Sequence, residues 1–203
     1  MSLYQITGPV VEPLTLIEAK KQVNQTEDFT DDDAYIEGLI PAARQRVEES
    51  ECALQLITAT YELRLDCFPV GPIIIPKAPL VEVLGITYID TNGVEQTFGG
   101  SPVTGYDVDI KSPHAPSFGE IHLAYGESWP VTRVQHNAVT VEFTCGFGDK
   151  PSDVPAGLKA WMLIALATMY SHRESEITGS IVAKLGFVDC LLDPWRAQGK
   201  RVY

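Results

Sequence analysis

A β-hairpin is predicted by the sequence Val81-Glu-Val-Leu-Gly-Ile-Thr-Tyr-Ile-Asp90 and its continuation Thr91-Asn-Gly-Val-Glu-Gln-Thr-Phe98. The first part is rich in β-branched and aromatic residues, which are enriched in strands. Asn92-Gly93 follows, and this dipeptide flanked by strand-forming residues is the strongest short-range hairpin signal. The chain is therefore expected to turn back on itself here, within an antiparallel sheet.

Further strands are predicted on both sides of this hairpin. Polar and apolar residues alternate from Thr58 to Asp66, with Tyr61, Leu63 and Leu65 on the apolar face, as in a half-buried strand. Prolines confine the segment around Ile73 to an edge or a connector. Other candidates, separated by turn residues, are Tyr106 to Ile110, Gly119 to Tyr125 and Ala138 to Cys145. We expect a small antiparallel sheet of about five to seven strands.

Two helices are predicted before the sheet. Thr15-Leu-Ile-Glu18 has the form of a capping box, which starts a helix from Leu16 to about Asn24. Acidic residues at Asp31 to Asp33 suit the first turn of a second helix, whose apolar residues recur at helical spacing to about Ser50. Pro41 lies inside it, so either the helix kinks there or its regular part begins near Gly38.

Helices are predicted again after the sheet. Asp153 is the expected cap, and the segment from Leu158 to Tyr170 is apolar on almost every face but too short to cross a bilayer. Such a helix lies either centrally in the core or between its own core and a neighbouring subunit. Ile181 to Leu192 has the spacing of an amphipathic helix that ends at Pro194.

The predicted fold class is therefore α+β, with helices at both ends of the chain bracketing an inserted antiparallel sheet. The chain has 203 residues, of which 45% are hydrophobic, and this suits one globular domain. Three parts are expected within it: helical residues 1–57, the sheet at 58–148, and helices with a polar tail at 149–203.

The charge is negative overall and unevenly distributed. The net charge is −12, which disfavours generic binding to a phosphate backbone. Residues 1–57 carry four basic and eleven acidic side chains, residues 58–148 four and ten, and residues 149–203 seven and six. The less acidic C-terminal part would suit nucleic acid, an acidic protein partner or simply a solvated helix of mixed charge.

No motif supports catalysis, and we predict no catalytic, cofactor-binding or metal-binding residue. Gly146 to Lys150 lacks the spacing of a phosphate-binding loop, and the run Asp31 to Asp33 suits helix capping better than a hard cation. His172-Arg-Glu174 is more typical of a helix C-terminus than of acid–base chemistry. The cysteines have no metal-binding spacing, and we expect them to be buried, reduced thiols rather than two disulfides. They are Cys52, Cys67, Cys145 and Cys190.

The order of the features nevertheless resembles that of head–tail connector (adaptor) proteins of tailed bacteriophages and related gene-transfer particles. The resemblance is collinear over about residues 14 to 175, and Pro41 departs from the alanine-like residue expected there. The segments that carry it are Leu14-Thr-Leu-Ile-Glu-Ala-Lys20, Asp31 to Asp33, Ile36-Glu-Gly-Leu-Ile-Pro-Ala-Ala-Arg44, Leu56-Ile-Thr-Ala-Thr-Tyr-Glu-Leu63, Pro76-Lys-Ala-Pro-Leu80, Ile86 to Gly93, Tyr125-Gly-Glu-Ser-Trp-Pro130, Asn137-Ala-Val-Thr-Val141, Gly146-Phe-Gly148 and Val154-Pro-Ala-Gly-Leu-Lys-Ala160.

This resemblance implies a structural virion protein without a cofactor and without enzymatic activity. Such proteins form a ring of about a dozen subunits under the portal, where each contact between neighbours is heterologous. The ring joins capsid to tail, extends the DNA channel and offers a platform to the next stopper or tail component. An acidic lining would let DNA pass without specific binding. The protein would be made in the bacterial host cytoplasm and reside in the virion neck, away from any membrane.

Two other classes remain open: another neck or tail-completion (terminator) protein, and a small hydrolase using His172 and Glu174 or the aspartate run. For the connector, we expect two sets of contact residues. The subunit interface is predicted on the apolar helix at Trp161, Met162, Leu166, Met169 and Tyr170. The portal-docking element is predicted in the charged and aromatic tail at Trp195, Arg196, Lys200, Arg201 and Tyr203.

Overall fold

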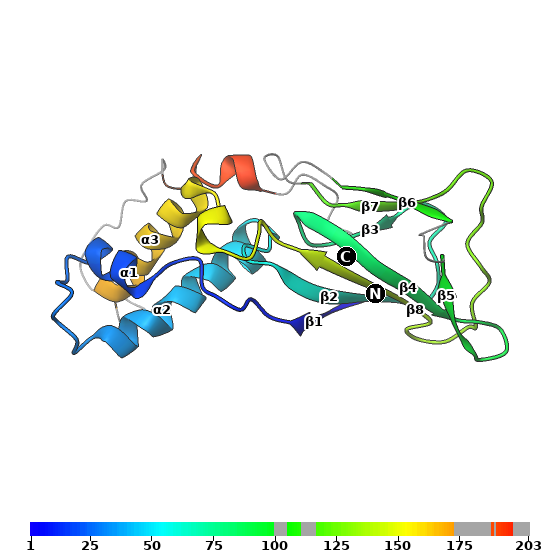
Figure 1. The fold of residues 1–203 in the computed structure, drawn as a ribbon, viewed down its shortest axis with the longest axis horizontal. Coiled ribbons are helices and arrows are strands. Elements are labelled where there is room, and N and C mark those ends of the chain that lie inside the picture. Colours follow the sequence, from blue (N-terminus) through cyan, green and yellow to red (C-terminus); the bar gives the residue numbers. More distant parts are fainter. Residues whose placement is uncertain (100–104, 111–116, 173–187, 189, 197–203) are drawn as a thin grey trace, which may run out of the picture.

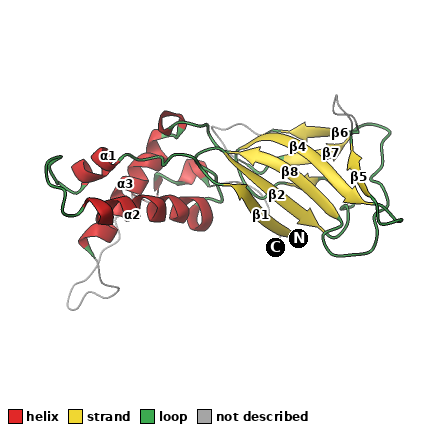
Figure 2. Ribbon diagram, turned by 60° about the horizontal axis from the view of Figure 1, so that its bottom comes forward, coloured by secondary structure: helices red, strands yellow, loops and turns green. Residues whose placement is uncertain are grey.

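The structure is a computed structural model that describes residues 1–99, 105–110, 117–172, 188 and 190–196. The helices of these residues gather at one end of an elongated molecule, and the strands occupy the other end (Figures 1 and 2). The main elements are β1 (Ser2–Thr7), α1 (Leu16–Gln22), α2 (Asp33–Gln45), β2 (Ala59–Leu65), β3 (Ile73–Ile74), β4 (Leu80–Ile89), β5 (Glu95–Phe98), β6 (Tyr106–Asp109), β7 (Glu120–Leu123), β8 (Val139–Cys145) and α3 (Ala156–Ser171).

The prediction that helices at both ends of the chain bracket an inserted sheet is wrong. The chain begins with a strand, β1, which pairs antiparallel with β2 and forms one edge of a five-stranded sheet in the order β1-β2-β8-β4-β5. In the described part of the chain, α1, α2 and α3 pack on one another beside the sheets. Ser2 to Thr7 is too short to show a clear period, so its pairing with β2 makes it a strand.

The expected single sheet is in fact two. The middle segment contributes β2 to β8, but β3, β7 and β6 form a separate three-stranded sheet in that order. The two sheets share one apolar core, whose fully buried members include Leu63, Val141, Phe143, Ile73 and Ile121. The apolar side chains on one face of a sheet need a second layer to cover them. Here the second sheet provides that layer.

The predicted hairpin and the edge position of Ile73 are confirmed. β4 and β5 pair from Ile86 opposite Phe98 to Ile89 opposite Glu95, and Gly93 has a φ of 85°. The Asp90 carboxylate accepts hydrogen bonds from the backbone N–H groups of Asn92 and Val94, which closes the turn. A glycine with positive φ in a short hairpin loop is a common way to make such a turn.

The helical end has its own core, formed by one face of each helix and by the segment between α2 and β2. The Thr15 capping box at the start of α1 is confirmed. α2 begins at Asp33 and runs through Pro41, so the alternative of a start near Gly38 is wrong. After Gln45 the helix continues as a π-helix, η1 (Arg46–Glu51). π-helical turns are rare and often lie at functional sites.

α3 starts differently from the prediction. Its N-cap position is Pro155, whereas the Asp153 carboxylate accepts a hydrogen bond from the Lys150 backbone N–H and caps the preceding 3-10 helix, η2 (Pro151–Asp153). The helix predicted from Ile181 to Leu192 lies mostly outside the described residues, although Leu192 is buried in the helical core. Among the described helices, none combines the length and the hydropathy of a bilayer span.

The cysteines are not uniformly buried as predicted. The four form no disulfide; Cys52 and Cys145 are buried, whereas Cys67 and Cys190 are exposed. Burial raises the pKa of the Cys52 thiol to about 11 and that of the Cys145 thiol to about 12.

Candidate functional site

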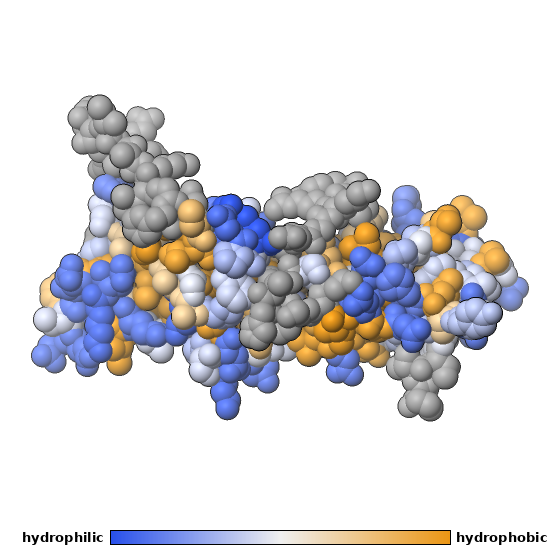
Figure 3. Space-filling model, turned by 90° about the horizontal axis from the view of Figure 1, so that it is seen from above, coloured by the Kyte–Doolittle hydropathy of each residue, from blue (hydrophilic) through white to orange (hydrophobic). Residues whose placement is uncertain are grey.

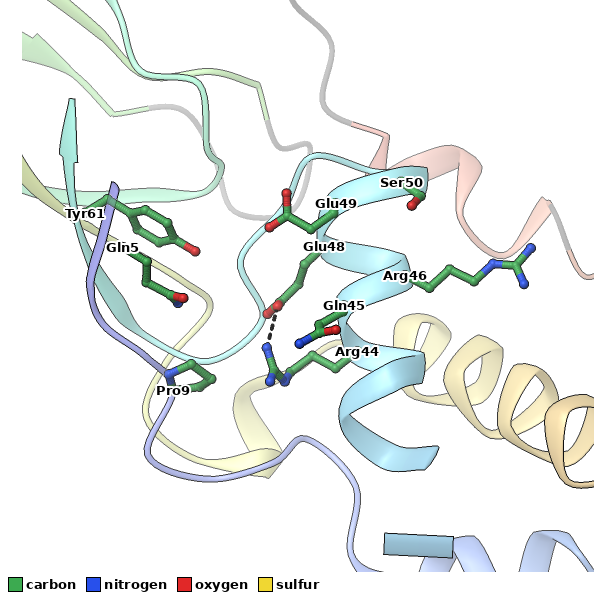
Figure 4. A pocket seen from close by; sticks show the side chains of 9 residues that line it. All are labelled: Gln5, Pro9, Arg44, Gln45, Arg46, Glu48, Glu49, Ser50 and Tyr61. Carbon is green, nitrogen blue, oxygen red and sulfur yellow. Dashed lines mark hydrogen bonds and ion pairs between the residues drawn. The ribbon is translucent and has the colours of Figure 1, made fainter. Parts of the chain in front are cut away.

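A cleft of about 390 Å³ lies where the helical end meets the sheets. Figure 4 shows η1 on one side, with β1 and the segment that follows it on the other. The residues that line this junction cleft are Gln5, Pro9, Arg44, Gln45, Arg46, Glu48, Glu49, Ser50 and Tyr61. They come from three separate parts of the sequence, and four of the nine are charged.

Arg44 joins two carboxylates across the junction. Its Nε donates to Glu12 Oε2 at 2.8 Å and its Nη1 donates to Glu48 Oε2 at 2.7 Å. The Arg44 side chain is 11% exposed and that of Glu48 only 4%. Glu12 belongs to the segment between β1 and α1, so this guanidinium fastens that segment to the end of α2. A planar guanidinium suits such two-sided pairing better than an ammonium group.

The second oxygen of Glu48 is bound by the chain that leads into β2. Glu48 Oε1 accepts hydrogen bonds from Gln55 Nε2 at 3.0 Å and from the Leu56 backbone N–H at 2.9 Å. Gln55 Oε1 in turn accepts a hydrogen bond from the Tyr61 hydroxyl at 2.7 Å. Burial raises the pKa of Glu48, while the Leu56 N–H and the Arg44 charge oppose that rise. A continuous buried chain of hydrogen bonds thus runs from α2 to β2.

Lys77 completes the polar network from the far side. Its ammonium donates to Glu49 Oε1 at 2.7 Å and to the carbonyl oxygens of Glu48 and Leu54, each at 3.3 Å. The residue is 4% exposed, so its charge has little access to solvent. Buried charges are tolerated when they are paired and hydrogen-bonded. The Lys77 ammonium meets this condition, because the Glu49 carboxylate and two carbonyl oxygens accept its hydrogen bonds.

The polar side chains at the junction cleft connect the helical end to the sheets. Each buried carboxylate and cation described above already has a partner, and none of the residues that line the cleft pairs a nucleophile with a general base. The network ties the N-terminal segment, α2, η1 and β2 to one another. It therefore holds the helical end and the sheets in one relative orientation.

A second hollow lies at the opposite end of the sheets. This tip groove has a volume of about 790 Å³ and is lined by Asp66, Cys67, Phe68 and the loop Trp129 to His136. The Trp129 ring stacks on Phe68 with centroids 4.7 Å apart, so this tryptophan is part of an aromatic cluster. Val131 and Val134 beside it are 77% and 102% exposed. Figure 3 shows one face of the molecule, on which hydrophobic and hydrophilic areas alternate.

Three of the five residues predicted at a subunit interface lie inside the chain's own core. Trp161 is 4% exposed, and Met162 and Leu166 are fully buried. The helix was expected to have more apolar surface than one core could cover, but α1 and α2 both pack on α3 and Leu192 joins the same core. With 4% or less of each residue exposed, these three offer almost no surface to a neighbouring subunit in this structure.

Met169 and Tyr170, at the end of α3, are only partly buried. The Tyr170 hydroxyl donates to the Asp32 carboxylate and accepts a hydrogen bond from Gln25 Nε2 at 3.2 Å. The Tyr170 ring lies 5.9 Å from that of Tyr35. These contacts join α3 to α2 and to the loop between α1 and α2.

The predicted portal-docking tail is partly attached to the core. Trp195 ends a 3-10 helix, η3 (Asp193–Trp195), and its ring meets the edge of Phe147 with centroids 5.7 Å apart. Arg196 is exposed and pairs with Asp193 at 2.7 Å. The expectation that everything after Pro194 lies outside the core is therefore wrong for Trp195. Lys200, Arg201 and Tyr203 lie outside the described residues.

The described residues give no support to a metal site at Asp31 to Asp33 or to acid–base chemistry at His172 and Glu174. Asp33 pairs with the buried Lys20 at 2.8 Å, and Asp32 occupies the N-cap position of α2 without capping it. Within the described ranges, no three His, Cys, Asp or Glu side chains are grouped as metal ligands. His172 is exposed at the C-terminus of α3, and Glu174 is not among the described residues.

Known protein-family models and curated proteins give no match to this chain. Solved structures do. The chain matches one in the virion of a native gene transfer agent (GTA) particle with a TM-score of 0.79 and 22% identity, over 98% of this chain and 97% of the other. With the same coverage, it matches a chain of the neck of an empty GTA particle computed with C6 symmetry, with a TM-score of 0.77 and 23% identity. It also matches a chain of the neck of a native GTA particle computed with C12 symmetry, with a TM-score of 0.71 and 22% identity.

The chain has the fold of a GTA neck chain. The match extends over both the helical end and the sheets, so it includes β1 and the junction between the two ends. Sequence reasoning missed both features. A signal for β1 was present, because Met1 to Val11 contains no charged side chain although 21% of the whole chain is charged. For the network around Glu48, spacing offered no comparable signal, because its members are brought together only by folding.

Proposed function

We propose that this protein is a structural component of the neck of a phage-like particle. The observation that carries the proposal is the similarity of fold, over nearly the whole of both chains, to chains of GTA necks. The lack of a catalytic grouping in the two described hollows is consistent with a structural role. A protein of this kind acts through its surfaces, and no bond is made or broken.

The finer proposal is a connector that forms a ring beneath the portal. One neighbour of similar fold belongs to a neck computed with C12 symmetry and another to a neck computed with C6 symmetry, and about twelve subunits is compatible with both. The ring would join the capsid to the tail and extend the DNA channel. Its carboxylates, with a net charge of −12 per subunit, would repel DNA and let it pass without specific binding.

The elongated shape suits a subunit that has different partners at its two ends. Met169 and Tyr170 belong to the last turn of α3, and the exposed Val131 and Val134 line the tip groove. We propose that Met169 and Tyr170 contribute to contacts between subunits. We further propose that the C-terminal tail from Arg196 onward docks on the portal, and that a stopper or tail component binds at another surface.

The test is negative-stain electron microscopy of the purified protein, alone and after mixing with its cognate portal protein. We expect rings with about twelve-fold symmetry that stack coaxially on the portal. A matched truncation removes residues 197–203 and keeps Trp195, whose ring packs on Phe147. This variant should keep the melting temperature of the full chain and lose portal binding.

Three results would change the proposal. Full portal binding by the truncated chain would place the docking surface elsewhere. Rings that cap tail tubes and ignore the portal would instead identify a tail-completion or terminator protein. Failure of the full chain to assemble with or without portal would overturn the ring.

A further inference from the structure

The edge of β1 differs from the other sheet edges of the described chain. β5 is four residues long and includes Glu95, β6 includes Asp107 and Asp109, and β3 is two residues long and flanked by Pro72 and Pro76. Charges, prolines and short length all discourage an edge from pairing with another chain. β1 has six residues, none of them charged or proline. Its outer backbone groups are therefore better suited to accept a further strand than those of β3, β5 and β6.

Exposed apolar side chains continue along the same flank. Tyr4 is 45% exposed, Ile6 52% and Val10 93%. A register shift between Gln5 and Thr7 takes Ile6 out of the regular pairing with β2. Single exposed apolar residues are ordinary, but several within one short segment beside an unprotected edge mark an interaction surface. We call the edge of β1 together with Tyr4, Ile6 and Val10 the N-terminal strip.

The charge pattern points to the occupant of this strip. Two copies of a chain with a net charge of −12 repel each other wherever their acidic surfaces meet. Met1 to Val11 contains no charged side chain, and the first acidic one, Glu12, is already paired with Arg44. The strip is thus a place where one acidic copy can approach another with little repulsion. In a ring, each copy presents different surfaces to its two neighbours, so the strip would meet a different region of the next copy.

We propose that the N-terminal strip is the lateral docking surface for a second copy of this chain, which adds an extended segment to the outer edge of β1. This inference rests on the ring put forward above and names one of its contact surfaces. Backbone pairing would supply affinity, and the exposed side chains of Tyr4 and Ile6 would supply register. Since Gln5 and Pro9 also line the junction cleft, the docked copy would cover part of that cleft.

The experiment compares the assembly of three proteins by sedimentation velocity and mass photometry at equal concentrations. The strip variant carries Ile6→Asp and Val10→Asp. The control carries Val131→Asp and Val134→Asp, which change two exposed apolar residues of the tip groove. We expect the wild type and the control to assemble, and the strip variant to need at least about tenfold higher concentration because two charges are placed in each interface.

Hydrogen exchange of the wild type gives a second readout that does not depend on a substitution. The backbone amides of Ser2 to Thr7 that face away from β2 should exchange more slowly in the assembled fraction than in the monomer, because a strand paired to the outer edge protects them. Circular dichroism and the melting temperature of the strip variant should match those of the wild type, since both substituted side chains lie at the surface.

The outcomes separate this inference from the ring itself. Normal assembly of the strip variant with unprotected β1 amides would overturn the docking surface and leave the ring intact. Slow exchange of β1 in the monomer, lost when residues 197–203 are removed, would identify the chain's own C-terminal segment as the occupant and also overturn the proposal. A wild type that never assembles, with or without portal, would overturn both.

Discussion

Replacing Arg44 by methionine tests whether the polar network stabilises the junction between the helices and the sheets. Methionine keeps much of the packing of the aliphatic stem but removes the cation between Glu12 and Glu48. The Glu48 carboxylate, 4% exposed, would then remain buried without its nearest counter-charge. Loss of one partner of a buried ion pair costs about 3–5 kcal/mol.

The structure places the expected cost at the lower end of that range. Glu48 Oε1 keeps its hydrogen bonds from Gln55 and from the Leu56 backbone N–H in the variant. We therefore expect a loss of about 3 kcal/mol in the free energy of unfolding at pH 8. For a chain of this size, this corresponds to a fall in melting temperature of roughly 6–12 °C.

The pH dependence gives the sharper signature. Burial raises the pKa of Glu48 in the folded protein, and Arg44 is one of the groups that limit this rise. Without Arg44 the folded pKa moves further above the unfolded value, so the stability lost through Glu48 is largest above the folded pKa. It is recovered as the pH falls and the carboxylate takes up a proton. The difference between variant and wild type should therefore shrink between pH 8 and pH 5.

Urea denaturation followed by circular dichroism measures both quantities. Arg46→Met is the matched control, because Arg46 is two residues away, 57% exposed, and paired with Glu51 at 3.5 Å. We expect the control to lose no more than about 1 kcal/mol, with little dependence on pH. A loss below about 1 kcal/mol for Arg44→Met, or one that grows on acidification, would refute the reasoning.

Three smaller tests address the local structure. Thr15→Ala removes the capping box of α1 and should lower the free energy of unfolding by about 1 kcal/mol in urea denaturation; an unchanged value would mean that the cap adds nothing. At pH 8, Cys67 should react rapidly with a disulfide reagent, whereas the buried Cys145, whose pKa is raised to about 12, should react only after unfolding, as peptide mapping would reveal. Gly146→Ala should cost more than about 1 kcal/mol, because a Cβ there would lie 2.6 Å from a backbone atom, whereas Gly71→Ala, which meets no atom within 4 Å, should be nearly neutral by thermal melting.

Local signals predicted the elements that depend on near neighbours in the chain. The Thr15 capping box needs only a residue three positions away, and it forms as expected. The turn around Gly93 and the alternation along β2 depend equally on short range, and the structure contains both. A two-residue period places Tyr61 and Leu63 on the buried face whatever the sheet later packs against.

The candidate site was harder to predict because its members are far apart in sequence. Glu48 and Tyr61 looked like parts of a helix and a strand, and only folding brings them onto the same buried glutamine, Gln55. Trp161 looked equally suited to a core or to an interface, since apolar composition does not say which neighbour covers a helix face. Packing of α1 and α2 on α3 decided for the core.

The amino-acid sequence by itself determined the caps, the turns, the strand and helix periods, and a net charge of −12, because each depends on neighbouring residues or on composition. Only the tertiary structure decided that β1 adds a strand to the first sheet, that β3, β6 and β7 form a second one, and that Arg44 and Lys77 hold the junction together. These features arise from backbone pairing and burial between distant segments. The free energy of such contacts depends on which surfaces meet, and no local pattern contains that information.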